Sequence, residues 1–265
     1  MVVIGRVSKG SKMDQVYIPK NRIGLDIGRY VLISSFDEGK ESKIDKPYFY
    51  GVSNVGSLKI EIINKIFRAV ENSVESYENI IVGGSFIDEG FDFNDIDVLI
   101  VSDDKLNVKI IEKMLERDIG AKIHVVFIDN KSLIEGMSSD PLYIMILSKC
   151  AARKRFVYRI KRKINYKILD FHLLKSKALV DGFDVLSGRE KYKLTRNMIA
   201  ISLFLKGKKV SLDLVDKEIN KVFGLKDVRE IKLNMLKKND FLRRYKKVYE
   251  GTLNIVFRGI KDGAK

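Results

Sequence analysis

The sequence predicts an α+β fold with a small N-terminal β module, a central mixed α/β sheet and a C-terminal helical region. Apolar runs of strand length alternate with helical apolar spacing through residues 46–150, which is typical of helices layered on a sheet. Residues 151–265 show helical spacing almost throughout. A shorter strand-rich stretch precedes a charged linker at residues 37–47. We therefore expect three domains, spanning residues 1–45, 46–150 and 151–265.

The size and composition of the chain set its broad class. Its 265 residues, 45% of them hydrophobic, can form the cores of two domains or of one domain with an appendage. A single cysteine excludes a disulfide framework, and one cysteine with two histidines cannot build a zinc site of the usual kind. The N-terminus does not read as a signal peptide, and no apolar run reaches membrane-spanning length. We expect a cytoplasmic protein with no membrane partner.

The N-terminal residues 3–35 contain two strand-like runs, the step Ile-Pro-Lys at residues 18–20, and Gly-Leu-Asp-Ile-Gly-Arg at residues 24–29. This order resembles the swapped-hairpin modules of the AbrB/SpoVT family. Arg29 stands where that family usually has an aspartate, and the segment before Gly24 is shorter than usual. The resemblance implies a homodimer formed by strand exchange and, in many members, DNA binding. The alternative is a small β-barrel that lacks the short helix and has no DNA-binding role.

A Gly-Ser turn followed by two aspartates is the most informative pattern in the chain. Residues 58–74 carry apolar side chains three or four apart, which predicts a helix. An apolar run then enters the turn at Gly84 and Ser85, and a second apolar run carries Asp95 and Asp97. On a strand, residues two apart point to the same face. Two carboxylates that close repel each other unless a hard divalent cation neutralises them.

The turn and the acid pair together resemble the nucleotidyltransferase superfamily related to DNA polymerase β. That family has Gly-Ser, a spacer of roughly ten residues, and then two acids alternating with apolar residues. The resemblance implies that Gly84 and Ser85 bind the phosphates of a nucleoside triphosphate (NTP). It also implies that Asp95 and Asp97 are catalytic and hold Mg²⁺ or Mn²⁺. The implied reaction moves a nucleoside monophosphate from an NTP to an acceptor hydroxyl.

The sequence leaves the identity of the third catalytic group open. A helix is expected near residues 108–115 and a strand at residues 123–128, and the family normally places a third carboxylate on that strand. Here His124 stands at the matching position, and Asp129 is the nearest acid. Three options stay open. Asp129 takes the catalytic role from the strand end, or His124 acts as a base because a neutral imidazole accepts a proton. In the third, His124 is a core or edge histidine in an enzyme with two acids or in an inactive protein.

The C-terminal region reads as a series of helices. The apolar spacing predicts helices at residues 168–180, 194–205 and 210–223, with Gly224 ending the third. A last helix is expected at residues 228–249. In the resembling family, a helical appendage closes over the nucleotide or holds the acceptor.

The positive charge of the chain is concentrated in this helical region. Residues 151–265 hold 31 basic and 12 acidic residues, whereas residues 1–150 hold 19 and 23. The densest cluster begins with Arg153, Lys154 and Arg155 and has aromatic residues between its cations. Basic residues neutralise phosphates and aromatic rings stack on bases, so we expect nucleic-acid binding there. The alternative is a solvated helix face whose aromatic residues lie in the core.

Three functions remain open from the sequence. The first is a metal-dependent nucleotidyltransferase with a nucleic acid as the expected acceptor. The second is a DNA- or RNA-binding regulator in which the nucleotidyltransferase fold is catalytically degenerate. The third is a component of a toxin–antitoxin pair that modifies a protein or a tRNA.

Overall fold

The computed structural model divides into two compact units, residues 1–43 and residues 44–265. The residues that it describes are 7–12, 14–16, 46–91, 93–104, 107–157 and 160–262. In the first unit, β1 (Val7–Ser8) pairs antiparallel with β2 (Gln15–Val16). The other features expected of an AbrB-like module, including the Ile-Pro-Lys step and the short helix, lie outside the described residues.

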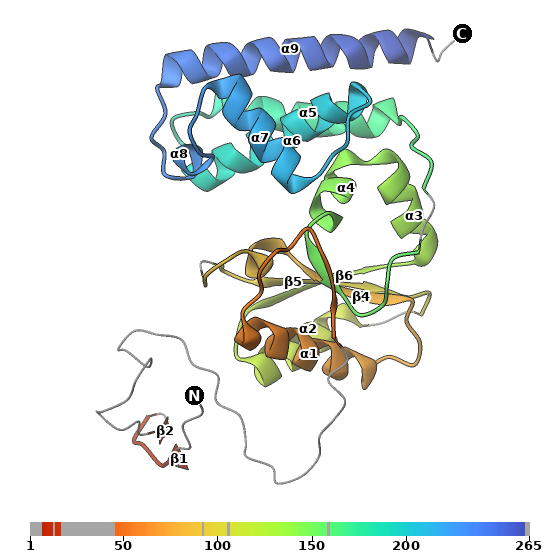
Figure 1. Ribbon diagram of the computed structural model, residues 1–265, viewed down its shortest axis with the longest axis vertical. Coiled ribbons are helices and arrows are strands. Elements are labelled where there is room, and N and C mark those ends of the chain that lie inside the picture. The colour runs from red at the N-terminus through yellow and green to blue at the C-terminus, as the bar shows by residue number, and fades with distance from the viewer. Residues whose placement is uncertain are drawn as a thin grey trace. The chain divides into compact units, whose positions relative to one another are not determined.

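The second unit is built around one five-stranded sheet (Figure 1). Its strands are β3 (Tyr48–Tyr50), β4 (Asn79–Gly83), β5 (Ile96–Val101), β6 (Ile123–Ile128) and β7 (Cys150–Ala152). Across the sheet their order is β3-β7-β4-β5-β6, with β5 and β6 parallel and the other neighbours antiparallel. This mixed sheet, followed by helices, confirms the expected α+β class. β7 crosses the domain boundary expected after residue 150, because it pairs with both β3 and β4.

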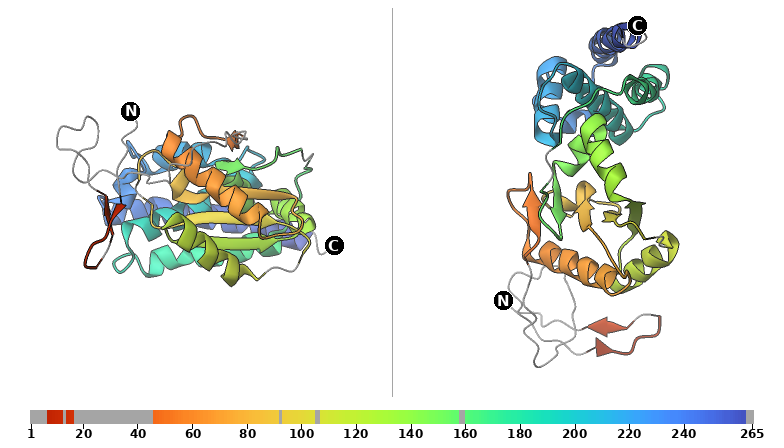
Figure 2. Two further views of the ribbon diagram at one scale, coloured as in Figure 1. Left: turned by 90° about the horizontal axis from the view of Figure 1, so that it is seen from below. Right: turned by 90° about the vertical axis from the view of Figure 1, so that its right-hand side faces the viewer.

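Helices pack on both faces of the sheet (Figure 2). α1 (Ser57–Glu71) and α2 (Val108–Ile119) share a core with the even-numbered residues of β5 on one face. α3 (Asn130–Ser139) and α4 (Pro141–Leu147) share a second core with Val101 on the opposite face. Because side chains alternate along a strand, the odd-numbered residues of β5 stand on the face of α3 and α4.

The remaining described residues form a helical region. Its helices are α5 (Tyr166–Asp181), α6 (Gly188–Leu205), α7 (Leu212–Phe223), α8 (Arg229–Lys232) and α9 (Lys238–Asp262). Their apolar sides meet in one core. A capping box between Ser187 and Glu190 starts α6, and Gly224, in the left-handed conformation at φ 67°, ends α7 as predicted. Among the helices of the described residues, none combines the length and apolar character needed to cross a bilayer.

The prediction of one last helix at residues 228–249 is wrong in two respects, because two helices occupy this range and the second continues to Asp262. α8 ends at Lys232 and α9 begins only at Lys238. Asn234 lies between them with a φ of 62°, a left-handed conformation that interrupts a helix. Its side-chain oxygen accepts a hydrogen bond from Lys191 Nζ at 2.6 Å, which ties the break to α6.

The helical region contacts the sheet through α4 and the residues that follow it. Met145 of α4 is completely buried in the core of the helical region. Ser148 Oγ accepts a hydrogen bond from the backbone nitrogen of Leu212, the first residue of α7, at 3.0 Å. The end of the sheet that carries Gly83 and Lys149 is therefore attached to the start of α7.

Candidate functional site

The Gly-Ser turn lies directly after β4 and against Asp97. Gly84 opens a short 3₁₀ turn, Gly84–Ile87, with a φ of 72°. A Cβ atom at position 84 would lie 2.1 Å from Asp97 Oδ2. Both the left-handed backbone and this close approach require glycine at this position. Ser85 follows and is exposed to solvent.

The strand register brings Asp97 next to both the turn and His124. Asp97 pairs with Gly83 across the antiparallel β4–β5 ladder and with His124 across the parallel β5–β6 ladder. Ile96 is buried in the core under α1 and α2. Asp97 therefore stands on the opposite face, where its side chain is 50% exposed. Asp95 directly precedes β5 and is partly exposed.

His124 occupies the position at which a third carboxylate was expected. Its Nδ1 lies 3.4 Å from Asp97 Oδ1, which is long for a hydrogen bond, and its side chain is 58% exposed. It is therefore not a core histidine. The imidazole borders one oxygen of Asp97, while the other oxygen lies over Gly84.

Asp129 lies at the other end of the strand. It caps α3, where its carboxylate accepts hydrogen bonds from the Ser132 backbone nitrogen at 2.7 Å and from Ser132 Oγ at 2.8 Å. These bonds lower the pKa of Asp129. It is five residues beyond His124, or about 16 Å along a strand. The structure therefore does not bring Asp129 to the acid pair and gives it a capping role instead.

Two lysines that the sequence analysis missed hold the loop between the turn and the acid pair. Lys59 of α1, only 4% exposed, donates a hydrogen bond from Nζ to the Asp88 carbonyl oxygen. Lys149 Nζ contacts Asp88 Oδ1 at 2.6 Å. The burial of Lys59 could have been predicted from the sequence, because Lys59 lies four residues before Ile63 and seven before Ile66, on the buried side of the predicted helix.

Aromatic rings enclose the Lys59 ammonium group. Its Nζ lies 5.4, 5.3 and 5.9 Å from the ring centres of Phe86, Phe91 and Phe93. Burial lowers the pKa of Lys59, the charge of Asp88 opposes this shift, and Lys149 adds to it. The contacts of Lys59 therefore tie α1 to both ends of the loop that joins the Gly-Ser turn to β5.

In the helical region, Tyr192 and Asp216 form a polar pair, and the charge of Asp88 in this loop affects the pKa of Tyr192. The Tyr192 hydroxyl donates to Asp216 Oδ1 at 2.7 Å. Burial raises the pKa of Tyr192, and the negative charges of Asp216 and of Asp88 raise it further. Burial also raises the pKa of Asp216. Tyr192 and Asp216 thus form a hydrogen-bonded polar pair within the helical region.

A cavity of about 720 Å³ opens beside Lys149, between the sheet and the helical region. Tyr50 and Phe156, with ring centres 4.6 Å apart, line its sheet side. Arg162 lines it as well, with its guanidinium carbon 3.9 Å from the ring centre of Phe204. The cavity thus combines aromatic surface with cations next to the site.

The donor atoms of the site suit a hard divalent cation. Asp95 and Asp97 supply carboxylates, and Mg²⁺ commonly takes one or two protein carboxylates and completes its shell with water and substrate phosphates. No cluster of three His, Cys, Asp or Glu side chains suited to a metal occurs in the part of the chain that the structure describes. The two aspartates would therefore rely on water and bound phosphate for the other ligands.

The three cations expected to bind nucleic acid have different surroundings. Arg153 Nε donates to Glu71 Oε1 at 2.6 Å, and both side chains are about one-fifth exposed. Lys154 Nζ donates to the carbonyl oxygen of Tyr77 at 2.8 Å and lies 4.2 Å from the centre of its ring. Arg155 is exposed. Arg153 and Lys154 thus join β7 to the residues around α1.

No protein-family model, curated protein or solved structure matches this chain.

Proposed function

We propose that this protein is a metal-dependent nucleotidyltransferase that moves a nucleoside monophosphate from an NTP to an acceptor hydroxyl. The observation that carries the proposal is the approach of Asp97 Oδ2 to within 2.1 Å of where a Gly84 Cβ would lie. A phosphate-binding turn and a metal-binding carboxylate must be neighbours in such an enzyme, because a divalent cation held by the carboxylate would neutralise charge on the bound phosphates.

Each residue of the site has a role in this proposal. The backbone at Gly84 admits phosphate oxygens, and the exposed Ser85 hydroxyl binds one of them. Asp95 and Asp97 hold Mg²⁺ or Mn²⁺, which neutralises phosphate charge when bound. Lys59 and Lys149 fix the intervening loop through Asp88.

The transfer itself needs an acceptor oxygen aligned with the α-phosphorus. The acceptor oxygen bonds to the α-phosphorus as the bond to the bridging oxygen breaks, and pyrophosphate leaves. His124, beside Asp97 and half exposed, takes the proton of the acceptor hydroxyl. The excess of basic residues after residue 150 supports a nucleic acid as the acceptor.

A second candidate is a nucleic-acid-binding regulator whose nucleotidyltransferase site is degenerate. The observation that favours it is His124 itself, which stands at the expected position of a third carboxylate next to Asp97. In that case the protein binds nucleic acid but transfers nothing.

A transfer experiment with two positions of label separates these candidates. The protein is incubated with Mg²⁺ or Mn²⁺, with NTPs labelled at the α- or the γ-phosphate, and with the nucleic acid that co-purifies with it. Nucleotidyl transfer attaches the α-label to an acceptor and releases the γ-label as pyrophosphate. Attachment of the γ-label would contradict the proposal, and no attachment of either label with any NTP would favour the regulator.

A further inference from the structure

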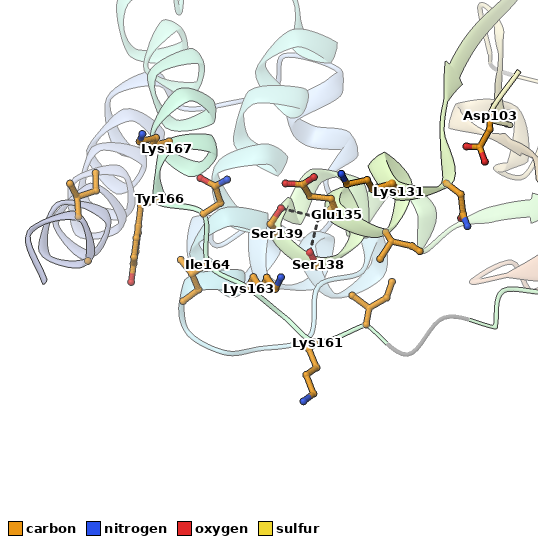
Figure 3. Close-up of a pocket in the computed structure, with 16 residues that line it drawn as sticks. Asp103, Lys131, Glu135, Ser138, Ser139, Lys161, Lys163, Ile164, Tyr166 and Lys167 are labelled. Atoms are coloured by element: carbon orange, nitrogen blue, oxygen red, sulfur yellow. Dashed lines mark hydrogen bonds between the residues drawn. The ribbon is translucent and has the colours of Figure 1, made fainter. Parts of the chain in front are cut away.

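A large hollow of the second unit lies away from the acid pair. It is a groove of about 1340 Å³ between α3, the segment 160–165, the start of α5 and the end of α9. Figure 3 shows its residues extending from Asp103, past α3, to Tyr166 beside α9. The groove brings together residues that are more than 150 positions apart in the chain.

Four lysines line this groove. Their side chains are exposed, and none makes an ion pair or a side-chain hydrogen bond with any residue that the structure describes. They are Lys131, Lys161, Lys163 and Lys167. Only two acids, Asp103 and Glu135, share the lining. These lysines therefore leave a surplus of positive charge that a phosphate chain can neutralise.

The start of α5 adds to this positive potential. It begins at Tyr166, which lines the groove, and the backbone N–H groups of a first helical turn carry partial positive charge, which favours an anion nearby. α3 also begins at the groove, at Asn130, but the Asp129 carboxylate already caps its first turn. The segment between the helices is fixed in place, because the Lys163 backbone nitrogen donates to the Ser138 carbonyl oxygen at 2.9 Å.

Aromatic and apolar surface lies among the cations. The ring of Tyr166 lies so close to α9 that a Cβ atom at Gly259 would be 2.0 Å from Tyr166 Cζ. Ile134, Ile164 and Ile260 also line the groove and are 38%, 44% and 40% exposed. A duplex hides its bases and presents phosphates, whereas a single strand offers bases that stack on such surface.

We propose that this groove holds a single-stranded nucleic acid, with the four lysines on its phosphates and Tyr166 beside a base. Binding of the strand in this groove does not depend on the proposed function. Only the strand's role as the acceptor of the nucleotide rests on that function. Asp97 lies six residues before Asp103 along the β5 side of the sheet, about 20 Å away. A bound strand would therefore pass along the edge strand β6 near Val126, which is 40% exposed, to bring its end to Asp97.

The first test is binding without metal or NTP, measured by the fluorescence anisotropy of a labelled single-stranded RNA and of the same sequence as DNA. Replacing Lys131, Lys161, Lys163 and Lys167 together by Ala should weaken binding about tenfold and flatten the log–log salt slope by about 3. A control variant removes four exposed lysines outside the groove: Lys193, Lys217, Lys221 and Lys226. The control should change affinity and slope by less than half as much.

Tyr166 gives a second, independent measurement. Tyr166→Leu should weaken binding about fivefold, because stacking on a base is lost, whereas Tyr166→Phe should stay within about twofold of the wild type. If the variant that lacks all four groove lysines does not fold, chemical acetylation of lysines in the wild-type protein, with and without RNA, replaces it as the test. RNA should then protect the four groove lysines and leave the four control lysines reactive.

Several results would overturn the inference. Equal losses in the groove and control variants, or equal protection of both sets of lysines, would assign the binding to net charge alone. Tighter binding of a duplex, or displacement of RNA by poly-glutamate or by anionic vesicles at matched charge, would exclude a single-strand groove. Asp97→Asn should bind RNA like the wild type. If the wild-type protein binds RNA in the groove but transfers no nucleotide, that failure counts against the proposed function and not against the groove.

Discussion

The carboxylate of Asp97 lies directly over Gly84, with Oδ2 only 2.1 Å from where a Cβ atom would be. The two residues are 13 positions apart in sequence and meet because Asp97 pairs with Gly83 across β4 and β5. Gly84 is therefore a point at which a side chain would both strain the backbone and displace the central carboxylate.

The first prediction compares two glycines of the same segment. Gly84→Ala should weaken NTP binding at least about tenfold, because the new methyl group collides with Asp97. Gly90 has nearly the same φ, 76°, but a Cβ there meets no atom of the described residues within 4 Å. Gly84→Ala and Gly90→Ala should each cost about 1–2 kcal/mol of folding free energy, because alanine is strained in the left-handed conformation. Calorimetric NTP titration and thermal unfolding measure the two effects. Equal NTP affinities in the two variants would remove Gly84 from the site.

The second prediction concerns the pH dependence of Lys59. Lys59→Met should cost about 1–3 kcal/mol at neutral pH, because the Asp88 carbonyl oxygen loses its donor. Burial lowers the pKa of Lys59 below 10.5, so between its lowered value and 10.5 the unfolded chain binds the proton that the folded protein has released. The stability of the wild type relative to Lys59→Met should therefore rise as the pH approaches 10.5. Urea unfolding of both proteins across that range tests this, with Lys109→Met, at an exposed position of α2, as control. A difference that does not change with pH would contradict the burial of the ammonium group.

The third prediction separates two neighbouring arginines. Arg153→Ala should cost about 1.5–3 kcal/mol of folding free energy, because Glu71 loses a charged hydrogen-bond donor in a partly buried site. Arg155→Ala, at an exposed position, should cost less than about 0.5 kcal/mol. Denaturant unfolding measures both values. Arg153→Ala should leave the log–log salt slope of RNA binding unchanged, because Arg153 is paired with Glu71. A slope flattened by about one unit would show that Arg153 binds a phosphate.

The fourth prediction tests the position of His124. His124→Asp should place a third carboxylate beside Asp97, which destabilises the protein without metal and increases the rise in Tm on adding Mn²⁺. Val126→Asp adds a carboxylate to the same face of β6, two residues farther along, and serves as control. The Mn²⁺-dependent rise should be larger for His124→Asp than for the control by at least about 2 °C. Equal rises would mean that position 124 does not adjoin a metal site.

The local patterns of the sequence predicted much of the site. The two-residue spacing of Asp95 and Asp97 and the flanking apolar residues were enough to place Asp97 on the exposed face of a strand. The four-residue spacing between Lys59 and Ile63 indicates that Lys59 is buried, but a lysine is normally expected at the surface, so its burial was not predicted. Asn234 broke the last helix without any glycine or proline to mark the break.

Contacts between distant residues explain what the sequence did not show. Arg153 is tied to Glu71, 82 positions away, so a run of charges cannot reveal which cations are already paired. The groove could not be predicted for the same reason, because Lys131, Tyr166 and Gly259 come from three helices that are far apart in the sequence. Asp129 is near His124 in sequence but at the far end of the same strand, since a strand separates residues by about 3.3 Å each.

The most direct test of the proposed function is the rate of α-phosphate transfer in Asp97→Asn and in a matched variant. Asp118→Asn removes the same charge from an exposed position of α2 and should transfer at a rate within about twofold of the wild type. Asp97→Asn should keep the Tm of the wild type within about 3 °C and lose transfer by at least about a thousandfold, because the carboxylate beside the Gly-Ser turn is gone. Transfer by Asp97→Asn at the wild-type rate, with the fold intact, would contradict the account.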